Sequence, residues 1–346
     1  MTAAVIVGAT GAVGEELRRI VAERELPVDE VRLVASPRSV GRRVPLRGRD
    51  VEVGPLEPEA FDGAAVAFFS AGGAISREWA PVAASRGTVV VDNSSAWRMH
   101  PQVPLVDADV NPGDAAAQQI GIVANPNCTT LTITPVLAVL RDLFGLAAIT
   151  PVSFQAAGGS GQRAMDELAD QAAKLIGDRE LLRRGGRPAA LPAGEVFPHP
   201  LAFNVIPQCM GFEDNGYTVE ELKLQNEPRK ILNLPDLASH PTCVRVPVMV
   251  GHSVSVRAVC ERPVDLDAFR SALAAAQGVT VVDDPGSAAY PTPLELAGTD
   301  GVFVGRIRAD LADPNALLFW SVADNLRKGA ALNAIQIGET LLAAAR

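Results

Sequence analysis

The chain has 346 residues, of which 48% are hydrophobic and 21% charged, and it carries a formal net charge of -9. This balance is typical of a globular protein, and the length predicts roughly two domains, each with its own core. The negative charge repels phosphate backbones and anionic lipid, which argues against nucleic acid or a membrane surface as a partner.

The first residues, MTAAVIVGATGAVG, contain no basic segment and only one short apolar run. A signal peptide needs a basic segment followed by a longer apolar run, and a membrane span needs about 20 apolar residues. We therefore expect a cytoplasmic protein. The four cysteines are widely spaced, with no C-x-x-C pair and no histidine at ligand spacing. This spacing argues against a zinc site, an iron–sulfur cluster and a disulfide framework, so no metal site is expected.

Residues 3–23 predict a buried strand, a glycine-rich turn and a helix. Gly8, Gly11 and Gly14 follow the pattern G-x-x-G-x-x-G. Without Cβ atoms, such a loop turns tightly and brings backbone N–H groups and the helix N-terminus against a pyrophosphate. A plain tight turn could use the same glycines, but their position after the first strand favours a dinucleotide-binding site.

The next predicted strand, EVRLVAS, bears on which dinucleotide binds. In an NAD-binding protein, an acidic residue near the end of this strand accepts hydrogen bonds from the ribose 2'-hydroxyl. Here that end carries Ser36, Arg38 and Ser39, whereas Asp29 and Glu30 lie at the opposite end. A guanidinium offers a planar fork of donors to phosphate oxygens, so the cluster favours the 2'-phosphate of NADP. The alternative is a solvated basic loop.

Two further apolar runs, at 64–73 and 87–98, predict strands separated by a helix over 75–85. Alternating strands and helices predict a doubly wound parallel sheet of the Rossmann type, an α/β fold. Ligands of such sheets bind at the carboxyl ends of the strands, so residues 70–73, which include Ser70 and Gly72, and residues 93–95 should line the cofactor side.

Cys128 stands between the turn Asn-Pro-Asn and an apolar stretch, 129–140, that predicts a helix which Pro135 could kink. The N–H groups of a first helical turn stabilise a thiolate by roughly 0.3 to 1 kcal/mol. A nearby base must supply the rest if Cys128 is a nucleophile. Without one, an inert buried cysteine is equally consistent with the sequence.

The candidate base is His252. Residues 242–260 alternate in polarity and predict two adjoining strands, with Arg245 on the first and His252 at the break before the second. A lone histidine near a strand end also suits a structural role.

In TPVSFQAAGGSG, a strand runs into a glycine-rich turn, where Gln155, Gly158 and Gly159 could let a substrate carbonyl or a nicotinamide approach the backbone. The alternative is that these glycines only form a tight connection between the strand and the following helix.

Together these segments resemble the aspartate-semialdehyde dehydrogenase family, and the likeness runs nearly from end to end. The most specific ones are GATGAVG, ASPRSVGRR, VVVDNSSAWRMHPQVPLV, ANPNCTT, NGYTVEELKLQNEPRKIL, TCVRVPVMVGHSVS, VGRIRAD and DNLRKGAALNAIQI. Related acyl-phosphate reductases usually carry Gly-Cys-Tyr at the nucleophile, where this chain has Asn-Cys-Thr. The resemblance implies an NADP-binding domain of residues 1–127 with 325–346, and an α+β catalytic and dimerisation domain with a mixed sheet over 128–324.

The activity implied by the resemblance is NADPH-dependent reductive dephosphorylation of L-aspartyl 4-phosphate to L-aspartate 4-semialdehyde. Cys128 would form a thioester, His252 would be the acid–base group, and Gln155 would orient the acyl group. Arg245 and Glu220 would hold the α-carboxylate and α-ammonium groups, whereas Arg98, Lys223 and Asn127 would hold the phosphate. Contacts to NADP are implied at Gly8, Thr10, Gly11, Ala12, Val13, Ser36, Arg38, Ser39, Ser70, Gly72, Gly158, Gly159 and Asn325.

The spacing of Glu220 and Lys223 places both on one helical face, although a solvated ion pair would have the same spacing. The resemblance also implies a homodimer through the catalytic domain, or a homotetramer built as a dimer of dimers. The family tends to show Val-Ser-Gly after Gln155, where this chain has AAGGSG, and tyrosine where Phe154 stands. These departures leave room for a specialised paralogue. The alternatives are a sister reductase acting on another amino-acid semialdehyde, and a catalytically silent homologue that serves as a subunit partner.

Overall fold

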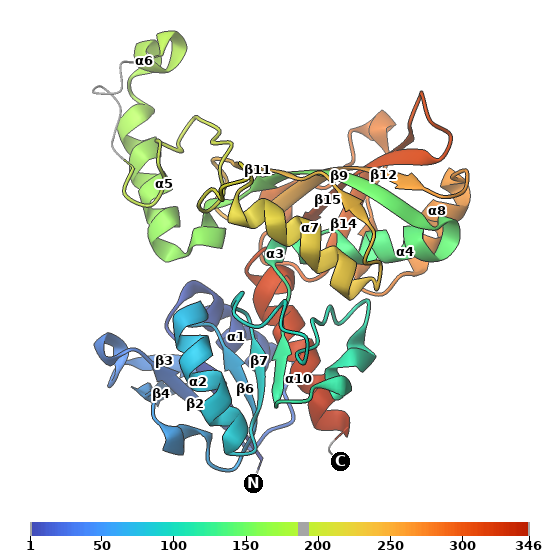
Figure 1. Ribbon diagram of the computed structural model, residues 1–346. Coiled ribbons are helices and arrows are strands. Elements are labelled where there is room, and N and C mark those ends of the chain that lie inside the picture. Colours follow the sequence, from blue (N-terminus) through green and yellow to red (C-terminus); the bar gives the residue numbers. More distant parts are fainter. Residues whose placement is uncertain (1, 186–193, 345–346) are drawn as a thin grey trace. The chain divides into compact units, whose positions relative to one another are not determined.

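The computed structural model describes residues 2–185 and 194–344 (Figure 1). The chain divides into two compact units. Unit 1 comprises Met1–Ala138, Asn226–Asp236 and Leu326–Arg346, and unit 2 comprises Val139–Gln225 and Leu237–Asn325. No helix among the described residues has the length and apolar character needed to cross a bilayer.

Unit 1 is built on a six-stranded sheet of order β5-β2-β1-β6-β7-β8, in which every pair of neighbours is parallel. Its strands are β1 (Ala3–Val7), β2 (Glu30–Ala35), β5 (Gly54–Pro55), β6 (Ala64–Phe69), β7 (Val89–Asp92) and β8 (Ile122–Ala124). Its main helices are α1 (Ala12–Glu23), α2 (Gly73–Ser85) and α10 (Leu332–Ala344). The prediction of a doubly wound parallel sheet is confirmed.

Strand β1 is fully buried because both faces of this sheet are covered. Successive side chains of a strand point to opposite faces, so β1 contributes to two cores. Ile6 packs in the core that contains Leu17 of α1 and Ile335 of α10, whereas Val5 packs in the core that contains Ala80 of α2. The apolar run of β1 reflects this double burial.

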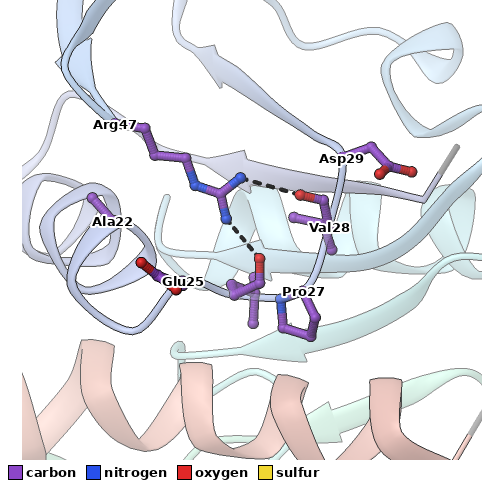
Figure 2. A pocket seen from close by; sticks show the side chains of 7 residues that line it. Ala22, Glu25, Pro27, Val28, Asp29 and Arg47 are labelled. Carbon is purple, nitrogen blue, oxygen red and sulfur yellow. Dashed lines mark hydrogen bonds between the residues drawn. The ribbon is translucent and has the colours of Figure 1, made fainter.

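A hairpin of β3 (Arg43–Leu46) and β4 (Arg49–Glu52) packs on unit 1 through Val44 and Leu46 and is held by two arginines, one of which is Arg18 of α1, whose Nη1 donates to the carbonyl oxygen of Pro45 at 2.7 Å. Arg47, in the turn, donates to the carbonyl oxygens of Leu26 at 2.6 Å and Val28 at 3.1 Å (Figure 2). The cavity beside this contact, about 580 Å³, contains none of the predicted site residues. Arg47 therefore ties the hairpin to the loop after α1.

The predicted helix over 129–140 is wrong as a single element, because two helices occupy this region: α3 (Cys128–Leu131) and α4 (Thr134–Phe144). Pro135 has no N–H to offer the carbonyl of Leu131, so the α-helical ladder cannot continue through it. Proline is tolerated in the first turn of a helix, and here it is the second residue of α4.

Unit 2 contains a seven-stranded mixed sheet of order β10-β9-β12-β15-β14-β13, with β11 also paired to β9. Its strands are β9 (Leu146–Gln155), β10 (Ala238–Ser239), β11 (Thr242–Arg245), β12 (His252–Cys260), β13 (Val279–Val281), β14 (Val302–Ala309) and β15 (Ala316–Ala323). The predicted mixed sheet is confirmed. The prediction that the strands containing Arg245 and His252 adjoin is wrong: β11 and β12 both pair with β9, which lies between them.

The remaining helices are α5 (Gln162–Leu175), α6 (Arg179–Arg184), α7 (Val219–Ile231), α8 (Leu266–Ala275) and α9 (Pro293–Leu296). Short 3-10 turns cover Pro37–Ser39, Pro58–Phe61, Pro112–Ala117, Ala157–Ser160 and Pro285–Ser287, and a π-helical turn covers Arg327–Ala331. Helix α7 contributes its first seven residues to unit 2 and the rest to unit 1.

Candidate active site

The predicted dinucleotide loop lies at the carboxyl edge of the unit 1 sheet. Gly8 follows β1 with φ +85°, and a Cβ there would collide with the carbonyl of Ser70, which follows β6. A Cβ at Gly14 would collide with the carbonyl oxygen of Gly8. Gly11 is the N-cap of α1, which Ala12 and Val13 begin, and Gly72 is the N-cap of α2 with φ +87°. Gly8 and Gly14 therefore allow close backbone approach between β1, the loop and α1, and Gly72 supplies the positive φ before α2.

A cavity of about 620 Å³ lies beside this loop and includes Gly8 and Ser36. Arg38 is exposed on the turn that follows, and Ser39 accepts a hydrogen bond from the hydroxyl of Thr10 at 3.0 Å. The cavity is also lined by the ring of Trp79 from α2. Sequence reasoning missed Trp79 because an aromatic residue inside a helix usually belongs to a core.

Cys128 is the first residue of α3 and is half-buried. Asn127, the N-cap, accepts the backbone N–H of Thr129 with its side-chain oxygen at 2.9 Å. This capping bond fixes the turn that presents the thiol, because it satisfies one of the N–H groups that a helix start leaves without a partner.

Arg98 is buried behind this turn in unit 1. Its guanidinium donates through Nε to the carbonyl of Asn125 at 2.9 Å, through Nη2 to that of Asn93 at 2.8 Å, and through Nη1 to Glu227 at 3.0 Å. The other oxygen of Glu227 accepts the backbone N–H of Asn127 at 2.7 Å. Sequence reasoning missed Glu227, although its spacing of four residues from Lys223 on α7 was a usable signal.

In unit 2, His252 begins β12 and is fully buried. The backbone N–H of Ala156 donates to its Nδ1 at 3.1 Å, so the neutral ring carries its proton on Nε2. Burial, reinforced by the charge of Arg245 and opposed by that of Glu220, lowers the pKa of His252 from 6.5 to about 3. The imidazole is therefore an uncharged donor at neutral pH, and its Nε2 has no hydrogen-bond partner among the described residues.

Gln155 and the predicted ion pair lie together in the same unit. The Nε2 of Gln155 donates to Glu220 Oε1 at 3.2 Å, and Lys223 Nζ lies 2.9 Å from Glu220 Oε2. The exposed fractions of the Glu220 and Lys223 side chains are only 5% and 14%. A solvated surface pair is therefore excluded, because both charges are withdrawn from water.

Arg245 ends β11 opposite Gln155 of β9. Its Nη1 donates to the carbonyl oxygen of Ala156 at 2.6 Å, and its Nε has no hydrogen-bond partner among the described residues. A buried cation that keeps a free N–H is suited to an anionic group of a ligand, since a guanidinium binds carboxylates through paired donors.

The glycines after Gln155 keep this cluster open. A Cβ on Gly159 would lie 3.1 Å from Nε2 of His252 and 3.2 Å from Nη1 of Arg245, and one on Gly158 would lie 3.5 Å from Nδ2 of Asn325. Asn325 accepts the N–H of Gly251 at 2.8 Å, whereas its Nδ2 has no hydrogen-bond partner in the described part of the chain. The side chains of His252, Arg245 and Asn325 therefore lie beside glycine backbone that carries no Cβ.

The predicted residues therefore fall into two sets. Unit 1 holds the dinucleotide loop, Arg98, Asn127 and Cys128, and unit 2 holds Gln155, Gly158, Gly159, Glu220, Lys223, Arg245, His252 and Asn325. In residues 2–185 and 194–344, no three or more histidine, cysteine, aspartate or glutamate side chains are arranged to hold a metal ion.

Comparison with known proteins assigns the family. Residues 3–118 match the model of the semialdehyde dehydrogenase NAD binding domain, and residues 137–328 match that of the semialdehyde dehydrogenase dimerisation domain. The aspartate-semialdehyde dehydrogenase of Streptomyces akiyoshiensis is 47% identical over 98% of both chains. The chain belongs to the aspartate-semialdehyde dehydrogenase family.

Two further members of this family support the assignment. The aspartate-semialdehyde dehydrogenase of Bacillus subtilis is 41% identical over 97% of this chain and 96% of its own. The crystal structure of aspartate semialdehyde dehydrogenase II from Vibrio cholerae superposes with a TM-score of 0.92 at 40% identity, covering 99% of this chain and 98% of that one. The resemblance and the fold class predicted from the motifs are confirmed, as is an oxidoreductase of amino-acid metabolism with an NAD(P)-binding domain.

Proposed function

We propose that this chain reduces L-aspartyl 4-phosphate to L-aspartate 4-semialdehyde and phosphate with NADPH, through a thioester on Cys128. The observation that carries the proposal is the buried cluster of Arg245, Glu220 and Lys223 beside the neutral imidazole of His252. An amino acid with an acyl phosphate carries a carboxylate, an ammonium group and a phosphate. Arg245, Glu220 and Lys223 offer one opposite charge to each.

The unit 1 edge fits a dinucleotide. Its glycines let the loop turn tightly and pack α1 against it, as a pyrophosphate site at a helix N-terminus requires, and the neighbouring cavity is lined by Trp79, an aromatic residue suited to a base. Arg38, flanked by Ser36 and Ser39, would hold the 2'-phosphate of NADP. When bound, the cofactor supplies a hydride to the acyl carbon.

The thiolate of Cys128 attacks the acyl carbon, the bond from carbon to the phosphate oxygen breaks, and phosphate leaves with the electron pair. Arg98 and Lys223 would hold that phosphate, and Arg245 and Glu220 would hold the amino-acid end. After hydride addition, the carbon–sulfur bond breaks and returns the thiolate. Gln155 would orient the acyl group throughout.

The described state of His252 favours a hydrogen-bond donor over the acid–base group implied by the resemblance. Collapse of the tetrahedral oxyanion to aldehyde and thiolate needs no net proton, because a lone pair of the oxygen re-forms the C=O bond while the sulfur leaves with the electron pair of the C–S bond. The Nε2–H of a neutral imidazole can therefore stabilise the oxyanion in both half-reactions, as a fixed donor in a site closed to water.

We further propose that unit 2 pairs with a second copy through its sheet. Val152, Ser255 and Trp320 form a row across β9, β12 and β15, and all three are only half-buried. Phe154 lies on the same face and contacts Trp320, with ring centroids 5.4 Å apart. A half-exposed sheet face that carries aromatic side chains indicates a protein interface.

The test is reduction of NADP by L-aspartate 4-semialdehyde, with and without phosphate. The reaction is monitored through the absorbance of the reduced nicotinamide. N-acetyl-L-glutamate 5-semialdehyde is the competing substrate, NAD the competing cofactor, and Cys128→Ala the matched variant. We expect phosphate-dependent turnover of the aspartyl compound alone, no turnover by the variant, and unchanged NADP binding. Turnover by Cys128→Ala above a few per cent of the wild type would refute the thioester.

A further inference from the structure

We propose that Glu227 is the positioning residue of the nucleophile turn, and that it fixes Cys128 and Arg98 as one unit. The proposal rests on the role of Cys128 proposed above. The two contacts of Glu227 are to a backbone N–H and to an arginine, both about a hundred residues or more away in the sequence.

Glu227 is buried, and the exposed fraction of its side chain is 2%. Its Oε2 accepts the backbone N–H of Asn127 at 2.7 Å, directly before the nucleophile. On the other side of Cys128, the N–H of Thr129 is held by the side chain of Asn127 at 2.9 Å. The backbone N–H groups on both sides of Cys128 are therefore fixed, that of Asn127 by the carboxylate of Glu227 and that of Thr129 by the capping side chain of Asn127.

The same carboxylate orients Arg98. A guanidinium has five N–H groups, and three are accepted here by Asn125, Asn93 and Glu227. Within the described residues, this leaves two N–H groups, one on each terminal nitrogen, to bind an anion. Because Glu227 holds Nη1 at 3.0 Å, it determines the direction in which these two donors point.

Glutamate is suited to this task because a carboxylate accepts on both oxygens. Glutamine of the same shape accepts on one oxygen only, and its NH₂ group must then face either the Asn127 N–H or the Arg98 guanidinium. The variant Glu227→Gln therefore keeps the volume of the side chain while it releases one of the two contacts. A purely structural ion pair would respond with lost stability alone.

The matched control is Glu221→Gln, on the same helix. Glu221 is also buried and also accepts two backbone N–H groups, from Thr218 at 2.7 Å and Cys243 at 3.0 Å, but it contacts neither Arg98 nor the nucleophile turn. Both variants lose one carboxylate and one accepted hydrogen bond. Glu227→Gln also leaves the buried charge of Arg98 without its carboxylate partner, so its melting temperature should fall further than that of Glu221→Gln.

The experiment measures kcat, KM for phosphate in the oxidative direction, and alkylation of Cys128 by iodoacetamide located by mass spectrometry. For Glu227→Gln we expect kcat to fall about tenfold to a hundredfold, because small displacements of a reacting group cost that much, with a raised KM for phosphate. Glu221→Gln should keep both values within about twofold of the wild type.

Values for Glu227→Gln within about twofold of those for Glu221→Gln would overturn the inference while leaving the proposed function intact. A wild type that neither oxidises the semialdehyde nor shows alkylation at Cys128 would overturn the proposed function itself. Should Glu227→Gln fail to fold, Glu227→Asp provides the test, because it keeps the charge but is one methylene too short to reach both donors. Wild-type kinetics in Glu227→Asp would equally overturn the inference.

Discussion

His252 should remain uncharged wherever the protein is folded and active. Its pKa is lowered to about 3, mainly by complete burial and then by the charge of Arg245. Protonation would also place a second N–H on Nδ1, where the N–H of Ala156 already points at 3.1 Å. The hydrogen-bond geometry and the cost of desolvating a charge therefore both oppose protonation of His252.

The lowered pKa has a consequence for stability. Between pH 6.5 and about 3, the unfolded chain binds a proton at His252 that the folded chain does not bind. Above pH 6.5 neither state binds this proton, and the free energy of unfolding has its full value with respect to His252. As the pH falls below 6.5, protonation stabilises only the unfolded chain, so the free energy of unfolding decreases until the pH reaches about 3. Each pH unit corresponds to about 1.4 kcal/mol, so acidification by about two units below 6.5 removes about 3 kcal/mol.

Two measurements test this reasoning. In protein labelled with ¹³C and ¹⁵N at its four histidines, the resonances missing from His252→Gln identify His252. We expect them not to titrate from about pH 8 to about pH 5, with nitrogen shifts of the Nε2–H tautomer. In urea unfolding, the wild type should lose more stability on acidification than His252→Gln, by about 1.4 kcal/mol per pH unit below 6.5. A titration midpoint near 6.5, an Nδ1–H tautomer, or equal pH slopes for the two proteins would refute the reasoning.

Arg38→Ala should weaken NADP binding by about tenfold to a hundredfold, as expected for a charged hydrogen bond to the 2'-phosphate, and leave NAD binding nearly unchanged; calorimetry measures both. Equal weakening of the two cofactors would mean that Arg38 does not contact the 2'-phosphate. Val152→Glu should convert a dimer to monomers in sedimentation velocity, because it places a charge in the half-buried row of unit 2, whereas Val152→Ala should leave the dimer intact. An unchanged sedimentation coefficient in Val152→Glu would place the interface elsewhere.

The parallel sheet of unit 1 could be predicted because its signals are local. Apolar runs such as Ala3–Val7, each followed by glycines and an amphipathic helix, require only the residues within one strand–helix unit. The order of strands in unit 2 could not be predicted in the same way. Polarity alternation in residues 242–260 identifies two strands, but their common partner β9 lies about a hundred residues earlier.

The candidate site was predictable where a residue's chemistry is unusual for its position. A cysteine at a helix start and glycines beyond a first strand are such cases. Burial was not predictable, because it depends on tertiary packing: Glu220 and Lys223 have the spacing of a surface pair, yet they are withdrawn from solvent. Glu227 and Trp79 were missed for a related reason, since a helical glutamate and a helical tryptophan have ordinary roles that the sequence cannot set aside.

Helix α7 carries buried charged side chains, which cost free energy of folding. Stability alone therefore does not explain them, and this supports a functional reason for its charges. Glu220, Lys223, Glu227 and Lys230 recur at helical spacing along one side, and each is paired: Lys230, for example, donates to the carbonyls of Arg98 at 2.7 Å, His100 at 3.0 Å and Val103 at 2.7 Å. Burial lowers the pKa of Lys230, which reflects the cost of holding its charge away from water. Apolar residues of similar volume would avoid that cost. In unit 1, Glu227 and Lys230 use their charges to hold Arg98, the turn before Cys128 and the loop after Arg98. In unit 2, the buried pair of Glu220 and Lys223 has the charges that the proposed function requires for an amino-acid phosphate.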